Sequence, residues 1–325
     1  MEEIKKYNYL VTGGAGFVGS NIVEFLLNNG AKKVRVLDDL SNGHLKNINP
    51  FMNDERFEFI KGDIRDLDTC KKAVKGIDYV AHQAALGSVP RSINDPITTN
   101  DVNVGGFLNM LVAVRDSDVK RFIYAASSST YGDHQALPKV EENIGKPLSP
   151  YAVTKYVNEL YADVFAKTYG VETIGLRYFN IFGPRQDPNG AYAAVIPLFM
   201  KAVYDNESAY MNGDGLQTRD FTYVANAVQA NVKAFFAPKE SANEVYNVAV
   251  GERISLLDLW NNLLEISGKN IPVIHRDPRQ GDVRDSLADI SKIKKGIGYN
   301  PSHTLAKGLK ETYEWFIQNI DFVNS

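Results

Sequence analysis

Short runs of apolar, β-branched residues alternate with longer amphipathic segments along the first 180 positions of the chain. The short runs predict strands at 7–14, 33–40, 56–64, 77–85, 120–128 and 171–179. The amphipathic segments predict helices at 19–30, 67–75, 100–117 and 151–169. Strands that alternate with helices are typical of βαβ units. The pattern therefore predicts the α/β class, with a doubly wound Rossmann parallel sheet whose ligands bind at the carboxyl ends of the strands.

The pattern changes after about Asn180, where proline and glycine become frequent. Helices are predicted at 191–206, 222–237, 255–267 and 302–320, and the run 244–250 looks like one more buried strand that returns to the sheet. We therefore expect a Rossmann domain over residues 1–180, with its sheet and helices completed by about 216–255. A smaller C-terminal α/β domain over residues 181–325 would form the substrate side.

The composition is that of a globular protein, since 44% of the 325 residues are hydrophobic, 23% are charged and the net charge is −3. No basic run points to nucleic acid, and no apolar run approaches the ~18 residues of a membrane span. The first 14 residues lack the separate apolar segment of a signal peptide. The single cysteine, Cys70, excludes a disulfide within the chain, and the five histidines have no metal-ligand spacing. We expect a cytoplasmic protein without a metal, nucleic-acid or membrane partner.

The segment "VTGGAGFVGS" places three glycines, Gly13, Gly16 and Gly19, between the first predicted strand and the first predicted helix. Glycine permits a tight turn and a close approach of the backbone to a pyrophosphate, and the helix N-terminus offers free N–H groups. Asp38 closes the second predicted strand 19 residues after Gly19, near the spacing expected of a ribose-binding acid. The combination predicts a dinucleotide-binding site.

Two neighbouring carboxylates, Asp38 and Asp39, indicate which dinucleotide binds. A carboxylate accepts hydrogen bonds from ribose hydroxyls but repels a 2′-phosphate, so NAD is favoured over NADP. Asp63, directly after the third predicted strand, is placed either to hold the adenine amino group or to lie in a solvated loop.

Tyr151 and Lys155 stand four residues apart at the start of a predicted helix that begins after Ser149 and Pro150. Four residues make about one helical turn, so both side chains project from the same face. A nearby ammonium favours the phenolate, so we expect the pKa of Tyr151 to be lowered from about 10. Such a tyrosine can take a proton from a hydroxyl and return it. The plainer alternative is a half-buried tyrosine beside a surface lysine.

Taken together, these motifs resemble those of an extended short-chain dehydrogenase/reductase, of the type that epimerises nucleotide sugars at carbon 4. The resemblance spans almost the whole chain, through "TGGAGFVGS", "HQAALGSVPRS", "AASSSTYGD", "YAVTK", "RYFNIFGPRQ", "NGDGLQTRDFTYV" and "GDVRDSLAD". It implies that Tyr151 and Lys155 work with a hydroxyl at the end of the preceding strand, which the spacing to Tyr131 assigns to Ser127, with Ser128 as the alternative. It also implies a tightly bound NAD, because the hydride that leaves the sugar is returned to it.

The resemblance also implies the remaining binding residues. The cofactor residues implied by the motifs are Gly13, Gly16, Phe17, Val18, Gly19, Asp38, Ser41, Asn42, Gly43, Asp63, Ile64, Gln83, Ala84, Ala85, Tyr151, Lys155 and Tyr178. The substrate residues implied are Gly87, Ser88, Ser129, Asn180, Ala194, Val195, Tyr210, Asn212, Arg219, Arg284 and Ser291. Among them Tyr210 would stack on uracil, and Arg219 and Arg284 would grip a diphosphate unless they form only surface salt bridges.

Relatives in the family that dehydrate or decarboxylate the sugar use a carboxylate just after the catalytic hydroxyl residue. This chain has Ser128, Ser129 and Thr130 there, and hydroxyls are poor acids in that role. A 4-epimerase of a UDP-hexose is therefore expected. Small residues at Gly87, Ala194 and Ser291 would leave room for a 2-acetamido group, which favours UDP-N-acetylglucosamine and UDP-N-acetylgalactosamine. UDP-glucose or a UDP-uronic acid is the alternative substrate.

The family pairs the two helices predicted at 100–117 and 151–169 with those of a second copy, so the resemblance implies a homodimer with a four-helix bundle at its interface. A competing hypothesis is a sensor that binds NAD and a nucleotide sugar without turnover. Sensors of this superfamily commonly lose the catalytic tyrosine or lysine, whereas both Tyr151 and Lys155 are present here.

Overall fold

The computed structural model describes residues 2–190, 193–277 and 284–324. Its centre is a seven-stranded sheet in the order β11-β6-β5-β4-β1-β2-β3, and every neighbouring pair is parallel. The strands are β1 (Asn8–Thr12), β2 (Lys33–Asp38), β3 (Phe57–Lys61), β4 (Tyr79–His82), β5 (Arg121–Ser127), β6 (Thr173–Tyr178) and β11 (Glu244–Val248). The predicted Rossmann sheet is confirmed, including the late strand that returns to its edge beside β6.

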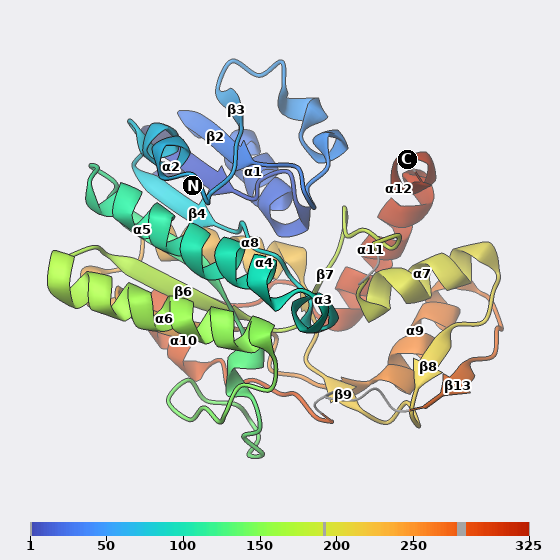
Figure 1. Cartoon of the computed structure of the whole chain (residues 1–325). Coiled ribbons are helices and arrows are strands. Elements are labelled where there is room, and N and C mark those ends of the chain that lie inside the picture. Colours follow the sequence, from blue (N-terminus) through green and yellow to red (C-terminus); the bar gives the residue numbers. More distant parts are fainter. Residues whose placement is uncertain (1, 191–192, 278–283, 325) are drawn as a thin grey trace.

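Helices cover both faces of the sheet (Figure 1). One face packs against α1 (Phe17–Asn28), α8 (Val224–Phe235) and α10 (Ser291–Ile297). The other packs against α2 (Leu67–Val74), α5 (Phe107–Arg115) and α6 (Pro150–Tyr169). Neighbouring residues of β1 show the division, because Tyr9 and Val11 belong to the first core and Leu10 to the second.

The C-terminal part has a third apolar core of its own. Its helices are α7 (Val195–Asp205), α9 (Leu256–Ser267), α11 (Leu305–Gln318) and α12 (Ile320–Asn324). Its short strands pair as β7 (Ile181–Phe182) with β10 (Thr222–Tyr223), β9 (Thr218–Arg219) with β12 (Ile254–Ser255), and β8 (Tyr210–Asn212) with β13 (Ile274–Arg276). These strands were not predicted, because two or three residues are too few to show a period. Among the described residues, no helix combines the length and apolar character needed to cross a bilayer.

The long helix predicted at 100–117 is divided in the structure. It consists of α4 (Pro96–Asn100), a π-helical turn (Asp101–Gly106) and α5, and the short α3 (Val89–Asn94) precedes it. The π-helical turn directs the buried side chain of Asn103 toward the loop after β4. There its amide accepts from Leu86 N at 2.7 Å and donates to Leu86 O at 3.1 Å and to Thr154 Oγ1 of α6 at 3.2 Å. The turn thus ties the loop after β4 to α6.

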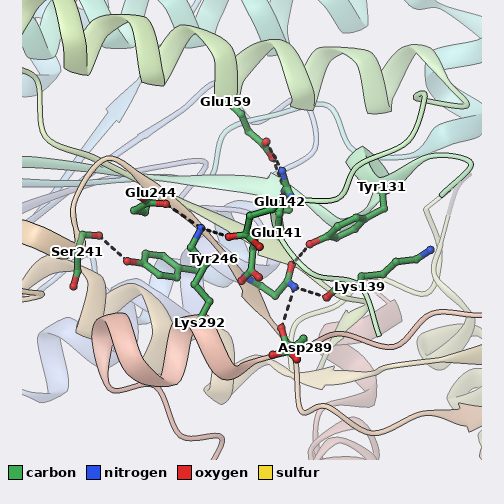
Figure 2. A network of polar contacts seen from close by, with 12 residues as sticks. Tyr131, Lys139, Glu141, Glu142, Glu159, Ser241, Glu244, Tyr246, Asp289 and Lys292 are labelled. Carbon is green, nitrogen blue, oxygen red and sulfur yellow. Dashed lines mark hydrogen bonds and ion pairs between the residues drawn. The ribbon is translucent and has the colours of Figure 1, made fainter. Parts of the chain in front are cut away.

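A buried polar network fastens α6 to the sheet (Figure 2). Arg177 of β6 donates to both carboxylate oxygens of Glu159, from Nε at 2.9 Å and from Nη2 at 2.7 Å, and both side chains are buried. Its Nη1 donates to Glu141 O at 3.0 Å, and its guanidinium lies over the ring of Tyr131. The Tyr131 hydroxyl donates to Asn247 Oδ1 of β11 at 2.6 Å. One arginine therefore connects α6, the segments after β5 and, through Tyr131, the edge strand.

His82 ends β4 beneath the carboxyl edge of the sheet and is 4% exposed. Its Nδ1 lies 2.8 Å from Thr12 Oγ1, and its ring packs against Phe107 and Phe122. Burial, with a smaller contribution from the positive charge of Lys155, lowers the pKa of His82 to about 3. His82 is therefore a neutral core residue.

The first prediction concerns the Arg177–Glu159 pair. Arg177→Met leaves a buried carboxylate without its partner, so the free energy of unfolding should fall by about 3–5 kcal/mol. The double variant Arg177→Met/Glu159→Met removes both charges and should recover more than half of that loss. Urea unfolding of the wild type, of the single variants Arg177→Met and Glu159→Met and of the double variant measures both effects.

The matched control is the exposed pair of Lys167 and Asp163 on the same helix. Lys167→Met should leave the urea midpoint near that of the wild type, because solvent screens exposed ion pairs. If the losses of the two single variants at Arg177 and Glu159 simply add in their double variant, then this buried pair is not coupled.

The second prediction concerns acid stability. The unfolded chain binds a proton at His82 near pH 6.5, whereas the folded protein resists it down to about 3. The contribution of His82 to stability should therefore fall by about 1.4 kcal/mol for each pH unit below 6.5, and His82→Gln should lack this contribution. Urea midpoints at pH 7, 6, 5 and 4.5 give the two slopes, and equal slopes would contradict the assignment.

Candidate active site

The carboxyl ends of the central strands border a cavity of about 680 Å³. The glycine turn after β1, the loop after β2 and the ends of β4, β5 and β6 form its walls, and α6 contributes Tyr151 and Lys155. The predicted cofactor residues that line this cavity are Gly13, Gly16, Phe17, Val18, Gly19, Asp38, Ser41, Asn42, Gly43, Ile64, Gln83, Ala84, Ala85, Tyr151, Lys155 and Tyr178. The sheet thus brings together residues that lie far apart in the sequence.

The glycine turn has no room for side chains. Gly13 has a φ of +66°, and a Cβ there would lie 2.7 Å from Ala84 N. A Cβ at Gly19 would lie 2.1 Å from Gly13 O, because α1 starts directly against the turn. Backbone therefore forms this part of the cavity wall, and the first turn of α1 presents its N–H groups there. This is the geometry that a dinucleotide pyrophosphate requires, so the residues present fit NAD.

Asp38 lies at the end of β2 beside the turn and is 7% exposed. Its Oδ2 accepts from Ala15 N and its Oδ1 from Leu40 N, both at 2.9 Å. Burial raises the pKa of Asp38, and the two N–H groups oppose that shift. Asp39, the next residue, accepts from Ser41. Two carboxylates at this end of the cavity suit ribose hydroxyls and disfavour a 2′-phosphate.

Asp63 is the predicted cofactor residue that does not line the cavity, although its neighbours Gly62 and Ile64 do. Its carboxylate accepts from Arg65 N at 2.8 Å and from Arg65 Nε at 2.9 Å. These hydrogen bonds, the largest being that of the Arg65 side chain, lower the pKa of Asp63. The geometry is that of a local ion pair beside the cavity.

The start of α6 fixes the side chains that the sequence analysis expects to be catalytic. Ser149 caps the helix by accepting from Ala152 N at 3.1 Å. One turn on, Lys155 is buried and its Nζ donates to Ala125 O of β5 at 2.8 Å. The hydroxyl of Ser127, at the end of β5, lies close enough to Tyr151 to act on its pKa. Of the two serines considered from the sequence, Ser127 is therefore the one that contacts the tyrosine, and Ser128 lines the cavity beside it.

The lowered pKa expected for Tyr151 is wrong for this structure. Burial raises its pKa, and the Ser127 hydroxyl only opposes that shift. Burial also lowers the pKa of Lys155 to about 8. The reason is that both groups are withdrawn from water, while the Lys155 ammonium donates to a backbone carbonyl and lies 5.9 Å from the centre of the Tyr151 ring. Desolvation outweighs their mutual interaction here.

A second cavity, of about 270 Å³, adjoins the first on the C-terminal side. The predicted substrate residues that line it are Asn180, Ala194, Val195, Tyr210, Asn212 and Arg219. Gly87, Ser88, Asn180 and Ala194 line the main cavity. Ser129, Arg284 and Ser291 line neither cavity. Ser129 donates to Ser127 Oγ, Arg284 binds Asp214 at 3.1 Å, and Ser291 starts α10 on the surface.

Tyr210 and Arg219 are held by their neighbours in the second cavity. The guanidinium of Arg276, on the paired strand β13, stacks 3.2 Å from the centre of the Tyr210 ring. Arg219 Nη1 donates to Thr218 O at 2.9 Å and to Arg284 O at 3.0 Å. These contacts hold an aromatic ring and a cation in the lining of the second cavity.

Asp220 holds the backbone of this region, a role that the sequence analysis missed. It is fully buried, and its carboxylate accepts from Val250 N at 3.2 Å, Gly251 N at 3.1 Å and Ala288 N at 3.3 Å. Burial raises the pKa of Asp220 to about 7 against the effect of these N–H groups. Its own carbonyl accepts from Asn180 Nδ2 at 3.0 Å. Asp220 thus joins three chain segments behind Asn180 and Arg219.

Asn231 and Gln186 were also missed. Asn231 of α8 closes a ring of hydrogen bonds in which Gln83 Nε2 donates to Asn231, Asn231 Nδ2 donates to the Tyr178 hydroxyl, and that hydroxyl donates to Gln83 Oε1. Gln186 lines both cavities. Its Nε2 donates to Ile181 O, and its buried Oε1 has no hydrogen-bond partner in the described part of the chain. Gln186 lies in the quoted motif "RYFNIFGPRQ", but Asn231 has no local sequence signal.

Three carboxylates of the described residues line the main cavity. Asp38 ends β2, Asp39 follows it in the loop, and Asp187 lies 3.4 Å from His44. The residues after Ser127 form a short 3₁₀ turn (Ser128–Tyr131) that presents hydroxyls. The site can therefore move a proton through Tyr151 and Ser127, but this turn places hydroxyls rather than a carboxylate beside them, and hydroxyls are poor acids for expelling a hydroxyl group.

Comparison with known proteins agrees with this geometry. Residues 9–249 match the model of the NAD dependent epimerase/dehydratase family. The chain is similar to the UDP-N-acetylglucosamine 4-epimerase of Methanobrevibacter ruminantium, solved with UDP-N-acetylmuramic acid, at 40% identity and a TM-score of 0.92 over 97% of this chain and 99% of that one. It is also similar to the UDP-glucose 4-epimerase of Thermotoga maritima, solved with UDP-glucose, at 36% identity and a TM-score of 0.91 over 96% and 99% of the two chains.

A further relative, the UDP-glucose 4-epimerase of Mycolicibacterium smegmatis, is 35% identical over 94% of this chain and 97% of its own length. The family resemblance and the NAD cofactor expected from the motifs are both confirmed. The chain therefore belongs to the NAD-dependent epimerase/dehydratase family and is an enzyme that uses NAD.

Proposed function

We propose that this enzyme interconverts UDP-N-acetylglucosamine and UDP-N-acetylgalactosamine by oxidising carbon 4 of the hexose and reducing it again from the other face. The observation that carries the proposal is the position of Tyr151, Lys155 and Ser127 in the main cavity, which adjoins a second cavity bearing an aromatic ring and a guanidinium. The relatives described above are 4-epimerases of UDP-sugars, which supports the same reaction type.

Tyr151 acts as the acid and base. It accepts the proton of the 4-hydroxyl, directly or through the nearby Ser127 hydroxyl, and later returns a proton to the same oxygen. Lys155, with a pKa of about 8, is largely protonated at pH 7 and stabilises the phenolate once it forms. When bound, NAD would supply the acceptor for the hydride of carbon 4 and the donor for its return to the opposite face. Protons and electrons therefore balance over the cycle, and NAD stays bound throughout.

The second cavity suits the nucleotide end of the substrate. Tyr210, backed by Arg276, offers a flat surface to a uracil ring, and Arg219 offers a guanidinium to the diphosphate. Arg284 is placed beside Arg219 by the hydrogen bond from Arg219 to its carbonyl. Elimination of a hydroxyl is disfavoured, because the turn after Ser127 carries no carboxylate.

The preference for an acetylated sugar rests on small residues and on one relative. Gly87 and Ala194 line the main cavity, and none of the described residues lies within 4 Å of a Cβ placed at Gly87. Space alone admits a 2-acetamido group without adding affinity for it. The relative with 40% identity is an epimerase of the acetylated sugar. UDP-glucose and UDP-uronic acids are the competing substrates, and binding of NAD and a nucleotide sugar without turnover is the competing function.

The proposal includes a homodimer. Apolar side chains are exposed along α6 and the neighbouring short helices: Ile97 is 74% exposed, Val164 is 51% and Leu160 is 49%. Leu160 and Val164 are four residues apart and so share one face of α6. Helices α4 and α5 pack beside α6 (Figure 1). A second copy that covers this face would bury it in a four-helix bundle.

We place the enzyme in the cytoplasm, which fits a buried thiol at Cys70 and no disulfide.

The third prediction tests the reaction. In a proton NMR time course with UDP-N-acetylglucosamine and no added NAD, the wild type should produce the anomeric signal of the galacto epimer. Tyr151→Phe should lower the rate by about 10²–10⁴ because the proton has no acceptor, while the NAD content stays unchanged. Conversion of only UDP-glucose or UDP-glucuronate would support the epimerase mechanism but contradict the proposed preference for an acetylated sugar. No conversion of any of the three, even with added NAD, would support the sensor.

The fourth prediction tests the dimer. Light scattering after gel filtration should give twice the chain mass for the wild type. Leu160→Glu/Val164→Glu should give the monomer mass, because four carboxylates would meet at the interface. Leu198→Glu, an exposed leucine on α7, serves as the control and should remain dimeric. A monomeric wild type would contradict the proposal.

A further inference from the structure

Arg91 spans the main cavity and has no role in the mechanism above. It lies on α3, lines the cavity, and its Nη1 donates to Asn42 Oδ1 at 2.8 Å. Asn42 belongs to the loop after β2 and lines the same cavity from another wall. The two residues are 49 positions apart in the chain. The hydrogen bond therefore bridges two walls that the fold supplies separately.

The wall that carries Arg91 is held rigidly. Asn103 binds both the N–H and the carbonyl of Leu86 at the start of this wall. Ser88, with the unusual φ of +93°, then caps α3 by accepting from Arg91 N at 3.4 Å. A left-handed conformation at a residue with a side chain is strained and persists where its surroundings fix it. The backbone position from which the arginine extends is therefore set by the fold.

The opposite wall is equally fixed and lies against the glycine turn. Leu40 has a φ of +64° and its N–H is bound by Asp38. A Cβ at Gly43 would lie 2.7 Å from Asp38 Oδ1 and 2.9 Å from Ala15 Cβ. Because Asn42 precedes Gly43, the guanidinium of Arg91 reaches the part of the cavity beside the turn.

The charges that line the main cavity indicate what Arg91 could bind. The charged residues that line the main cavity in the described chain are Asp38, Asp39, Asp187, Arg91 and Lys155. Three carboxylates would repel the two negative charges of a dinucleotide diphosphate. Lys155 lies beside Tyr151 and donates to Ala125 O, whereas Arg91 extends toward the loop at the glycine turn. A guanidinium binds phosphate oxygens through several N–H groups at once.

We propose that Arg91, held in place by Asn42, is a ligand of the NAD diphosphate and closes the cavity over it. The proposal rests on the NAD-dependent function above and gives a physical reason for a cofactor that stays bound between turnovers. It concerns cofactor retention, and so its test needs neither a sugar nucleotide nor turnover.

The fifth prediction is a faster release of NAD from Arg91→Met. Full-length holoprotein is diluted into alcohol dehydrogenase and ethanol, which convert released NAD to fluorescent NADH. Loss of a charged, multidentate contact should speed release at least about tenfold and weaken its acceleration by salt. Arg91→Lys keeps the charge without the planar group and should lie between the two. Asn42→Ala should also release NAD faster, because the arginine loses its support.

Arg115→Met is the matched control, because Arg115 pairs with Asp116 on the surface and does not line the cavity. It should release NAD at the wild-type rate. Arg91→Met with wild-type release and salt dependence overturns the proposal. Weakened binding of UDP with unchanged NAD release also overturns it, since Arg91 would then serve the substrate. Should Arg91→Met fold poorly by circular dichroism, the comparison of Arg91→Lys with the wild type decides.

Discussion

The buried ion pair between Glu159 and Arg177 sets the geometry on which the active site depends. Glu159 follows Lys155 by four residues, and Lys155 follows Tyr151 by four, so the three share one face of α6. Two points of that face are attached to the sheet, Glu159 through Arg177 of β6 and Lys155 through Ala125 of β5. Two attachments fix the rotation of a helix about its axis. Tyr151 is therefore aimed at Ser127 by contacts that do not involve Tyr151 itself.

The same strand also positions the other side of the site. Arg177 and Tyr178 are consecutive residues of β6, so their side chains point to opposite faces of the sheet. Arg177 reaches α6, while Tyr178 joins Asn231 of α8 and Gln83 in a ring of hydrogen bonds. A displacement of β6 would therefore disturb both the proton-transfer residues and the wall of the cofactor cavity. Burying polar groups costs desolvation free energy, and this coupling explains why two such networks nevertheless converge on one strand.

Much of this arrangement could be predicted from the sequence, because its signals are local. Alternation of apolar runs gave the sheet, and the spacing of Gly13 to Gly19 and of Tyr151 to Lys155 gave the two main groups of site residues. The pKa of Tyr151 could not be predicted, since spacing reports proximity but not desolvation. Asn231 and Asp220 were missed for a related reason. Their partners lie on other segments, and an isolated asparagine or aspartate shows no pattern before the chain is folded.

The short segment after β6 connects the two cavities, and this connection places a physical limit on the proposed reaction. Asn180, Ile181, Gln186 and Ala194 line both cavities. A hexose that is reduced on its second face must turn while its nucleotide stays anchored, so the turning group must pass this segment. Asn180 is held in a left-handed conformation with a φ of +38°, and its amide is bound to Asp220 O. Because Asp220 also anchors the backbone next to Arg219, the residue proposed to bind the diphosphate and the wall past which the sugar would turn are fixed to each other. In the proposed reaction the sugar could then move while the nucleotide stays in place, which is what returning the hydride to the opposite face requires.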